Sequence, residues 1–343
     1  VHLTRSADLV AALLGVLKAG AAFVPFDPQQ PAARLDRIAE QAQPRLVLSE
    51  AALAERWAPA CLRLEMGDIP DSPAAPLVDT RGRGDAYVIF TSGSTGMPKG
   101  VVVGRAALAR YAHWAAAEFS PVPAARWALH SAIGFDLTLT SIFAPLVAGG
   151  QIRVYRDGAE GPDLAVLRVF AEDAVDVVKL TPAHLALVLQ DGRPADRIRS
   201  LVLGGEDLTT ASAARALEVL GRDVAIWNEY GPTEAVVGCM SHRFRPGVDT
   251  GRSVPIGRPA AATALYVLDG AGNPAADEVT GEIFVGGPDR LAEGYFRAPE
   301  ATAAAFVPDP FRPGARLYRT GDLGSVGRDG ILRYHGRIDT QLK

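Results

Sequence analysis

Residues 91–100 form a segment with the composition of an anion-binding loop. Its candidate residues are Thr91, Ser92, Gly93, Ser94, Thr95, Gly96 and Lys99. Glycine relaxes the steric restriction on φ, so successive backbone N–H groups can turn toward a common point. The hydroxyl groups and the ammonium of Lys99 add further donors. The sequence therefore predicts that this loop binds a phosphate group.

Apolar runs on both sides of this loop indicate strands. Residues 87–90 read YVIF and residues 101–103 read VVV, which are mainly β-branched and aromatic. We expect two strands joined by a hairpin-like phosphate loop. The spacing differs from that of P-loop NTPases, because Gly100 rather than Ser or Thr follows Lys99.

The chain around this loop alternates helical and strand patterns, which favours a layered α/β architecture. The expected helices cover residues 8–17, 105–119, 137–146 and 164–171, and the expected strands cover 22–25, 45–48, 175–180, 200–203 and 224–227. Residues 70–84 are rich in Pro, Gly and Asp and are predicted to be a surface connector. From residue 241 onward, short β-like runs such as 264–268 and 282–285 alternate with turns and predict a small barrel or sheet.

Composition excludes several classes of function. The 343 residues are 48% hydrophobic and carry a net charge of −4, which gives no electrostatic case for nucleic-acid binding. We find no apolar stretch of membrane-spanning length and no signal sequence. Cys61 and Cys239 lie far apart, which indicates idle thiols in a reducing compartment. We therefore expect a cytoplasmic protein without structural metal, nucleic-acid partner or membrane partner.

Three motifs resemble those of the adenylate-forming enzymes, and most closely the adenylation domains of nonribosomal peptide synthetases. TSGSTGMPKG at 91–100, NEYGPTE at 228–234 and YRTGDL at 318–323 occur in the order that the family has. LKAGAAFVPFDP at 17–28 and GEIFVGG at 281–287 also match, although relatives commonly have Arg where Glu293 stands. The resemblance implies ATP and Mg²⁺ as cofactors.

The same resemblance implies the domain organisation. It predicts an α/β fold with a layered αβαβα core of two sheets flanked by helices, N-terminally truncated, at 1–240. A β-barrel-like subdomain at 241–336 would follow. Residues 337–343 would begin a hinge to a missing C-terminal lobe, which supplies a lysine in relatives. An insertion after this point stays open, and we expect weak or no turnover from the fragment alone.

The resemblance also implies a role for each nucleotide residue. Tyr230 would stack on adenine, Asp322 would accept from the ribose hydroxyls, and Glu234 would hold Mg²⁺. Thr95, Lys99 and Glu234 would act in catalysis. The full candidate set for the nucleotide adds Gly205, Glu206, Asn228, Gly231, Thr233, Tyr334 and Arg337 to Tyr230, Asp322 and the loop residues.

Position-by-position similarity implies a substrate pocket. Its members are Asp136, Leu137, Thr140, Lys179, Val202, Gly204, Glu229, Val237 and Gly238. Asp136 would bind an α-ammonium, although from sequence alone the favoured interpretation of this residue is a helix N-cap. Lys179 and Glu229 offer one donor and one acceptor, which suit a carboxamide. The sequence thus predicts L-Asn, with L-Asp and Gln as alternatives.

The predicted reaction is attack of the amino-acid carboxylate on ATP, releasing pyrophosphate, followed by transfer to a carrier-protein thiol. The implied partners are a peptidyl carrier protein with a phosphopantetheine arm and a neighbouring condensation domain. Two other functions stay open. An acyl-CoA or aryl-acid ligase would share the loops but needs no ammonium-binding Asp136, and a degenerate nucleotide-binding module would lack turnover.

Overall fold

The computed structural model describes residues 1–57, 62–69, 78, 82–92, 97–156, 158 and 164–338. The helices are α1 (Ala7–Lys18), α2 (Ala32–Ala42), α3 (Ala51–Ala54), α4 (Arg105–Phe119), α5 (Leu137–Val147), α6 (Ala165–Glu172), α7 (Pro182–Asp191), α8 (Thr210–Leu220) and α9 (Pro299–Ala305), with 3-10 turns η1 (Glu55–Trp57), η2 (Met66–Asp68) and η3 (Thr233–Ala235). The strands are β1 (Leu46–Ser49), β2 (Leu62–Glu65), β3 (Asp85–Ser92), β4 (Pro98–Gly104), β5 (Arg126–Leu129), β6 (Gln151–Val154), β7 (Val177–Leu180), β8 (Ser200–Leu203), β9 (Ala225–Tyr230), β10 (Met240–Arg243), β11 (Arg258–Pro259), β12 (Ala264–Leu268), β13 (Gly281–Gly286), β14 (Gly294–Tyr295), β15 (Phe306–Pro308), β16 (Arg316–Val326) and β17 (Leu332–Arg337).

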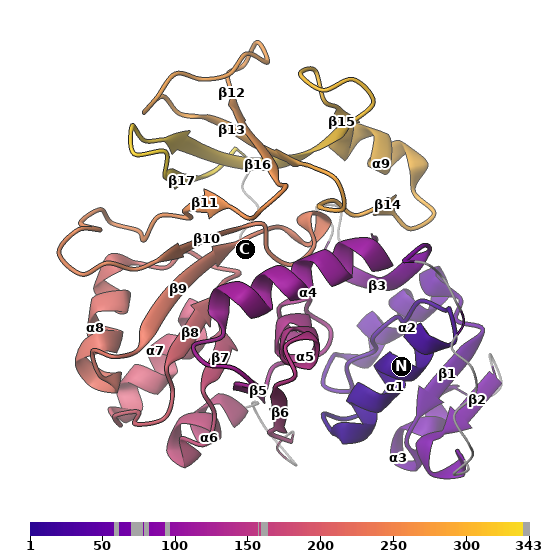
Figure 1. The fold of residues 1–343 in the computed structure, drawn as a ribbon. Coiled ribbons are helices and arrows are strands. Elements are labelled where there is room, and N and C mark those ends of the chain that lie inside the picture. Colours follow the sequence, from indigo (N-terminus) through magenta and orange to yellow (C-terminus); the bar gives the residue numbers. More distant parts are fainter. Residues whose placement is uncertain are drawn as a thin grey trace.

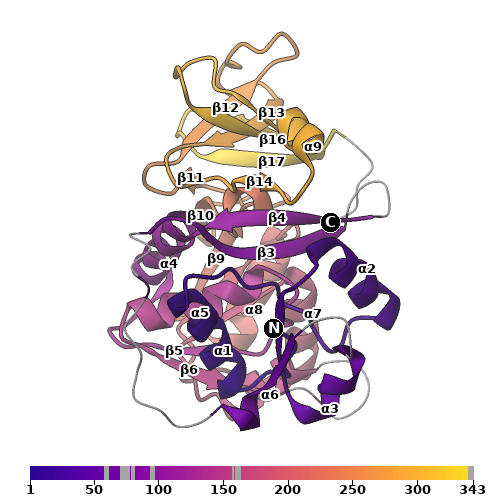
Figure 2. The ribbon, with the colours of Figure 1, turned by 90° about the vertical axis from the view of Figure 1, so that its right-hand side faces the viewer.

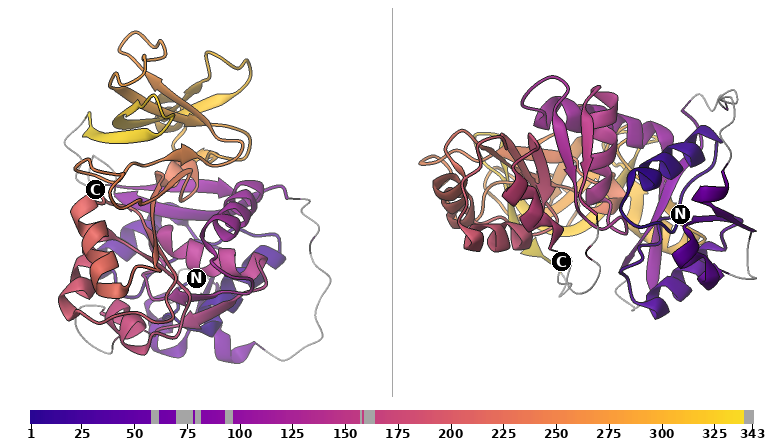
Figure 3. Two further views of the ribbon diagram at one scale, coloured as in Figure 1. Left: turned by 60° about the vertical axis from the view of Figure 1, so that its left-hand side comes forward. Right: turned by 90° about the horizontal axis from the view of Figure 1, so that it is seen from below.

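A seven-stranded sheet forms the centre of the larger part, in the order β11-β10-β9-β8-β7-β5-β6 (Figure 1). Strands β5 to β9 are parallel, and β10 and β11 run antiparallel at one edge. Strands β7 and β8 are buried along their whole length, as expected for parallel strands covered on both faces. Figure 3 shows helices on both sides of this sheet. The predicted α/β class is therefore confirmed.

Side chains of the parallel strands alternate between two cores, because successive residues point to opposite faces. Val178, Leu180 and Leu201 pack with α6, α7 and α8. Val177 and Val202 pack with α4 and α5 on the other face. This period places Lys179, which lies in register with Val202, on the face of α4 and α5. A lysine therefore enters a core that is otherwise apolar.

The phosphate-loop hairpin is present: β3 pairs antiparallel with β4, and β14 adds a third strand. Helix α4 packs on this sheet, and α5 packs on β5, β6 and β7. The strand expected at 22–25 is wrong, since only Phe23 forms an isolated bridge with Tyr87. Pro25 lacks the N–H that a longer ladder would need. The second layer of the core is a three-stranded sheet with a separate parallel pair, β1 and β2.

A smaller sheet of β12, β13, β16, β15 and β17 stacks beyond the seven-stranded sheet (Figures 1 and 2). The domain boundary at residue 240 stays a proposal. In the sheet pairing, β10 and β11 belong with the larger sheet, and the smaller one begins at β12. Strand β14 returns to pair with β4, which ties the two parts together.

Among the described helices, none combines the length and apolar character needed to cross a membrane. Cys239 is buried, and its Sγ donates to the backbone carbonyl of Tyr230 at 3.6 Å. Cys61 lies outside the described residues, as does most of the predicted connector at 70–84.

Candidate active site

A cavity of about 620 Å³ lies where the ends of β3, β8 and β9 meet β16 and β17. The carboxyl ends of parallel strands share one edge of a sheet, so residues distant in sequence meet there. The cavity is lined by Thr91, Ser92, Asp136, Gly205, Glu206, Asp207, Asn228, Glu229, Tyr230, Gly231, Pro232, Thr233, Glu234, Ile256, Tyr318, Thr320, Tyr334 and Arg337. Most of the predicted nucleotide residues are therefore brought together.

Five of these lining residues were missed by the sequence analysis: Asp207, Pro232, Ile256, Tyr318 and Thr320. Pro232, Tyr318 and Thr320 belong to the motifs NEYGPTE and YRTGDL, so their position in those motifs was the available signal. The predicted loop residues Gly93, Ser94, Thr95 and Gly96 lie outside the described residues.

Asp322 is buried behind the cavity wall, where it contacts the lining residues Tyr230 and Arg337. Its side chain is 1% exposed and accepts hydrogen bonds from the Tyr230 hydroxyl and from Arg337 Nη1, the latter at 3.0 Å. Tyr230 and Tyr334 face each other with ring centroids 6.4 Å apart. Burial, and next the Asp322 charge, raise the pKa of Tyr230 well above its usual value, so the phenol keeps its proton. Aromatic faces and a fixed carboxylate here suit a nucleoside.

Glu234 also lines the cavity and lies in η3. Its Oε1 accepts a hydrogen bond from Tyr295 Oη at 2.7 Å, and Lys99 Nζ lies 5.4 Å from the centroid of the Tyr295 ring. Lys99 is therefore near Glu234 but does not line the cavity itself. Burial and the Glu234 charge raise the pKa of Tyr295, which keeps it a donor. The sequence analysis missed this tyrosine.

The donor set around Glu234 fits Mg²⁺ in its usual protein setting. In the described part of the chain, no group of three or more His, Cys, Asp or Glu side chains could hold a metal. Mg²⁺ commonly takes one or two carboxylates and completes its octahedron with phosphates and water. A single cavity-wall carboxylate such as Glu234 matches that pattern.

Asp136 opens on the same cavity, immediately before α5. It occupies the N-cap position, as expected from the sequence, but its side chain makes no capping hydrogen bond. Its Oδ2 is buried and has no hydrogen-bond partner among the described residues. Burial raises the pKa of Asp136, while a hydrogen bond from Thr233 and the Lys179 charge oppose that rise. An unpaired buried carboxylate oxygen calls for a cationic ligand.

Lys179 and Glu229 form an ion pair beside Asp136, with side chains only 1% and 2% exposed. Glu229 lines the cavity, whereas Lys179 lies behind it. Burial lowers the pKa of Lys179, and the Asp136 charge counteracts that shift. Two unlike charges held in a core cost desolvation energy, which is tolerated where a function uses them.

Four of the remaining predicted pocket residues, Gly204, Gly238, Val202 and Thr140, lie near this pair. A Cβ on Gly204 would lie 3.3 Å from Lys179 Nζ, and a Cβ on Gly238 would overlap Glu229. Val202 is the register neighbour of Lys179. Thr140 reaches Glu229 through Tyr111, which donates to Glu229 Oε1 at 2.9 Å. Leu137 begins α5, and Val237 is buried with a φ of 65°.

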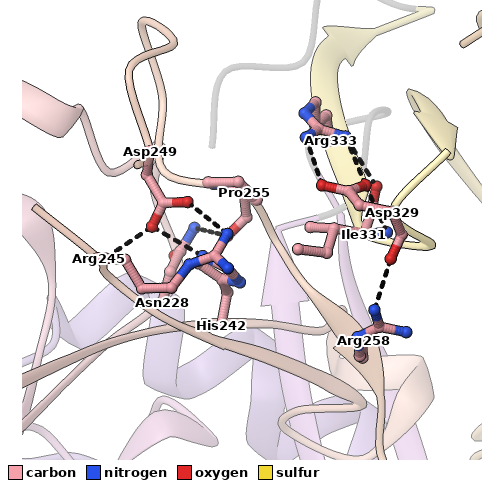
Figure 4. Close-up of polar contacts among 9 residues, drawn as sticks. All are labelled: Asn228, His242, Arg245, Asp249, Pro255, Arg258, Asp329, Ile331 and Arg333. Atoms are coloured by element: carbon pink, nitrogen blue, oxygen red, sulfur yellow. Dashed lines mark hydrogen bonds and ion pairs between the residues drawn. The ribbon is translucent and has the colours of Figure 1, made fainter. Parts of the chain in front are cut away.

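Asn228 lines the cavity and also anchors a neighbouring segment. Its side-chain amide donates to the carbonyl of Pro255 at 3.1 Å (Figure 4) and to the carbonyl of Val254 at 2.9 Å. Glu206 also has an internal use, because its Oε2 accepts from the backbone N–H of Ala183 at the start of α7. Both residues therefore shape the wall with polar atoms that are already satisfied.

A second groove of about 590 Å³ lies next to the cavity and shares Asp207 and Tyr334 with it. Figure 4 shows the two ion-paired groups near this groove. In one, Asp249 is bound by His242 and Arg245, each at 2.9 Å. In the other, Asp329 pairs with Arg333 and accepts from Arg258 through its backbone carbonyl. The cationic and anionic groups here are satisfied by one another.

Replacing Asn228 by alanine is expected to lower the free energy of unfolding. The carbonyls of Val254 and Pro255 would lose their donors, at about 1–3 kcal/mol for a buried group left unpaired. Urea denaturation measures this loss, and we expect the KM for ATP to rise by less than about tenfold. Asn228→Asp keeps the shape but not the donors. An Asn228→Asp protein as stable as the parent would contradict the anchoring role.

Comparison with known proteins identifies the family. The family model for AMP-binding enzymes matches residues 1–296. Bacitracin synthase 3 of Bacillus licheniformis is 41% identical over 99% of this chain, and tyrocidine synthase 3 of Brevibacillus parabrevis is 40% identical over 99%. The chain spans only 5% of the length of each of these relatives.

Solved structures agree with this result. The nonribosomal peptide synthetase FmoA3, in its α-methyl-L-serine-AMP bound form, has a TM-score of 0.88 at 29% identity, covering 99% of this chain and 39% of that one. The four-domain synthetase AB3403, bound to AMP and glycine, has a TM-score of 0.84 at 32% identity, covering 100% and 25%. The chain therefore belongs to the AMP-binding enzyme family and, within it, to the adenylation domains of nonribosomal peptide synthetases.

Proposed function

We propose that this domain activates an amino acid by adenylation and that its preferred substrate is L-asparagine. The observation that supports activation most is the buried Oδ2 of Asp136, which has no partner among the described residues and belongs to a wall of the nucleotide-type cavity. Thr91, Ser92 and Glu234 line that same cavity. The cavity therefore contains groups that can bind the phosphates of ATP, together with a carboxylate, Asp136, that can bind the ammonium group of an amino acid.

The chemistry that this arrangement favours needs no protein nucleophile. A carboxylate oxygen of the amino acid attacks the α-phosphorus, and the bond to the bridging oxygen breaks as pyrophosphate leaves with its electron pair. Such a reaction depends on alignment and charge neutralisation. Mg²⁺ bound at Glu234 would supply charge neutralisation at the phosphates. Asp136 would hold the α-ammonium, and Tyr230 and Asp322 would orient the adenosine.

The Lys179–Glu229 pair supports a carboxamide side chain. A carboxamide can enter between them, accepting from the Lys179 ammonium and donating to the Glu229 carboxylate. L-Asp would instead place a further carboxylate beside Glu229 and Asp136, where like charges repel. Glutamine offers the same groups on a chain one methylene longer, so we rank it second.

Pyrophosphate exchange with L-Asn, L-Asp, L-Gln and L-Glu tests this proposal, on the longest natural polypeptide that contains this chain. We expect L-Asn to give the largest kcat/KM, and a preference for L-Asp would contradict the pairing argument. Exchange with aryl or fatty acids but not with amino acids would favour an acid ligase instead. ATP binding without any exchange would favour a nucleotide-binding module.

The proposed next step is transfer of the aminoacyl group to the thiol of a phosphopantetheine carrier protein, beside a condensation domain. The likeness to peptide synthetases supports these partners. Radiolabelled L-Asn retained on a holo carrier protein, and not on its unmodified form, would support the transfer.

A further inference from the structure

Tyr111 lies in α4, and its side chain is almost completely buried, at 1% exposure. From sequence it is one aromatic residue on the apolar stripe of a core helix. The hydroxyl group nevertheless extends beyond the apolar core. It donates to Glu229 Oε1 at 2.9 Å and lies 2.6 Å from Thr140 Oγ1.

The positions of the hydrogens follow from the number of donors. A phenol has one proton, and Tyr111 gives it to Glu229, so Thr140 must donate to the phenol oxygen. Burial raises the pKa of Tyr111 well above its usual value, although the hydrogen bond with Thr140 opposes that rise. The phenol therefore stays protonated. The hydrogen bonds therefore run in series: Thr140 donates to Tyr111, and Tyr111 donates to Glu229.

This series of hydrogen bonds gives each oxygen of the Glu229 carboxylate a defined partner. Oε1 accepts from Tyr111, and Oε2 faces Lys179 Nζ. Gly238 limits movement on another side, because even a Cβ there would lie 2.2 Å from Glu229 Oε1. With both oxygens accepting, Glu229 is held as an ionised acceptor and cannot offer a proton to a substrate carboxylate.

We propose that Tyr111 is a positioning residue for substrate specificity: its hydroxyl keeps Glu229 oriented and ionised, so that the Lys179–Glu229 pair accepts a carboxamide and rejects a carboxylate. This inference rests on the proposed activation of L-Asn. Without the Tyr111 hydroxyl, Oε1 would lose its buried donor. Glu229 would then be free to rotate or to take up a proton, and a protonated Glu229 can donate to the side chain of L-Asp.

Tyr111→Phe tests the proposal, with kcat/KM measured for L-Asn and L-Asp by pyrophosphate exchange. We expect the Asn-to-Asp ratio to fall by about tenfold or more, as for loss of a hydrogen bond to a charged group. The KM for ATP should not change.

Tyr87→Phe is the matched control. Tyr87 is also completely buried, and its hydroxyl has no hydrogen-bond partner in the described part of the structure. Tyr87→Phe also removes one phenol oxygen but leaves the hydrogen bonds of Glu229 unchanged. We therefore expect this variant to have the same Asn-to-Asp ratio of kcat/KM as the parent protein. Thr140→Val is a second variant, in case Tyr111→Phe fails to fold. It removes the donor to Tyr111 and should lower the ratio in the same direction but less.

Equal loss of activity toward both amino acids in Tyr111→Phe, with an unchanged Asn-to-Asp ratio, would overturn the proposal and leave Tyr111 a core residue. An unchanged ratio in Thr140→Val would overturn it if only that variant folds. A parent protein that activates neither amino acid would instead refute the proposed function. The two failures are therefore distinguishable.

Discussion

Asp136→Ala is expected to reduce amino-acid-dependent pyrophosphate exchange by about 10²–10³-fold, the range for truncating one partner of a buried charge pair. The α-ammonium would lose its counter-ion in a cavity where Glu234 and Glu229 already have other partners. ATP binding should change little, because Tyr230 and Asp322, and not Asp136, are proposed to hold the adenosine. Exchange assays with L-Asn and equilibrium binding of an ATP analogue measure the two effects.

Asp136→Asn is the matched control for shape. It keeps the volume and removes the charge, so it should lose most of the same activity. Because burial raises the pKa of Asp136, the ionised side chain opposes folding at neutral pH, and the neutral variant should unfold at a higher temperature. A variant that exchanges L-Asn at the parental rate would refute the ammonium role and favour an acid ligase.

The nucleotide wall could be predicted from sequence for a physical reason. Two of the motifs include the end of a strand, where the backbone leaves a sheet and polar side chains can meet a ligand. The ends of β3 and β9 supply residues of the same cavity, although β3 lies in the three-stranded sheet and β9 in the seven-stranded one. Lys99 was expected beside the phosphates from its place in the loop, whereas in the structure Tyr295 contacts both Lys99 and Glu234.

Contacts of side-chain polar atoms could not be predicted in this way. Whether the amide of Asn228 faces a ligand or two carbonyls depends on where the loop before Ile256 returns to the sheet. Tyr111 has the spacing of a core residue, and only tertiary packing brings its hydroxyl to Glu229. The expected strand at Phe23 failed because an apolar pattern does not show which backbone groups find a ladder partner.

Glu229→His is expected to shift the preference from L-Asn toward L-Asp. The substitution removes the carboxylate that repels the side chain of L-Asp and leaves Lys179 to pair with it. Like-charge contacts cost several kcal/mol at an interface, and even about 3 kcal/mol changes the Asn-to-Asp ratio about 10²-fold. The ratio of kcat/KM values from pyrophosphate exchange is the measurement.

Glu229→Gln separates the effect of charge from the effect of shape. It keeps the length of the side chain and one acceptor for Tyr111, so it should also favour L-Asp while perturbing the core least. Glu229→Asp is the complementary variant, because it shortens the side chain but retains its charge. It should still prefer L-Asn to L-Asp, with a lower kcat/KM for both. If all three variants rank L-Asn and L-Asp as the parent does, the charge of Glu229 does not reach the substrate. The side-chain subsite would then have to lie elsewhere along the cavity wall, away from the Lys179–Glu229 pair.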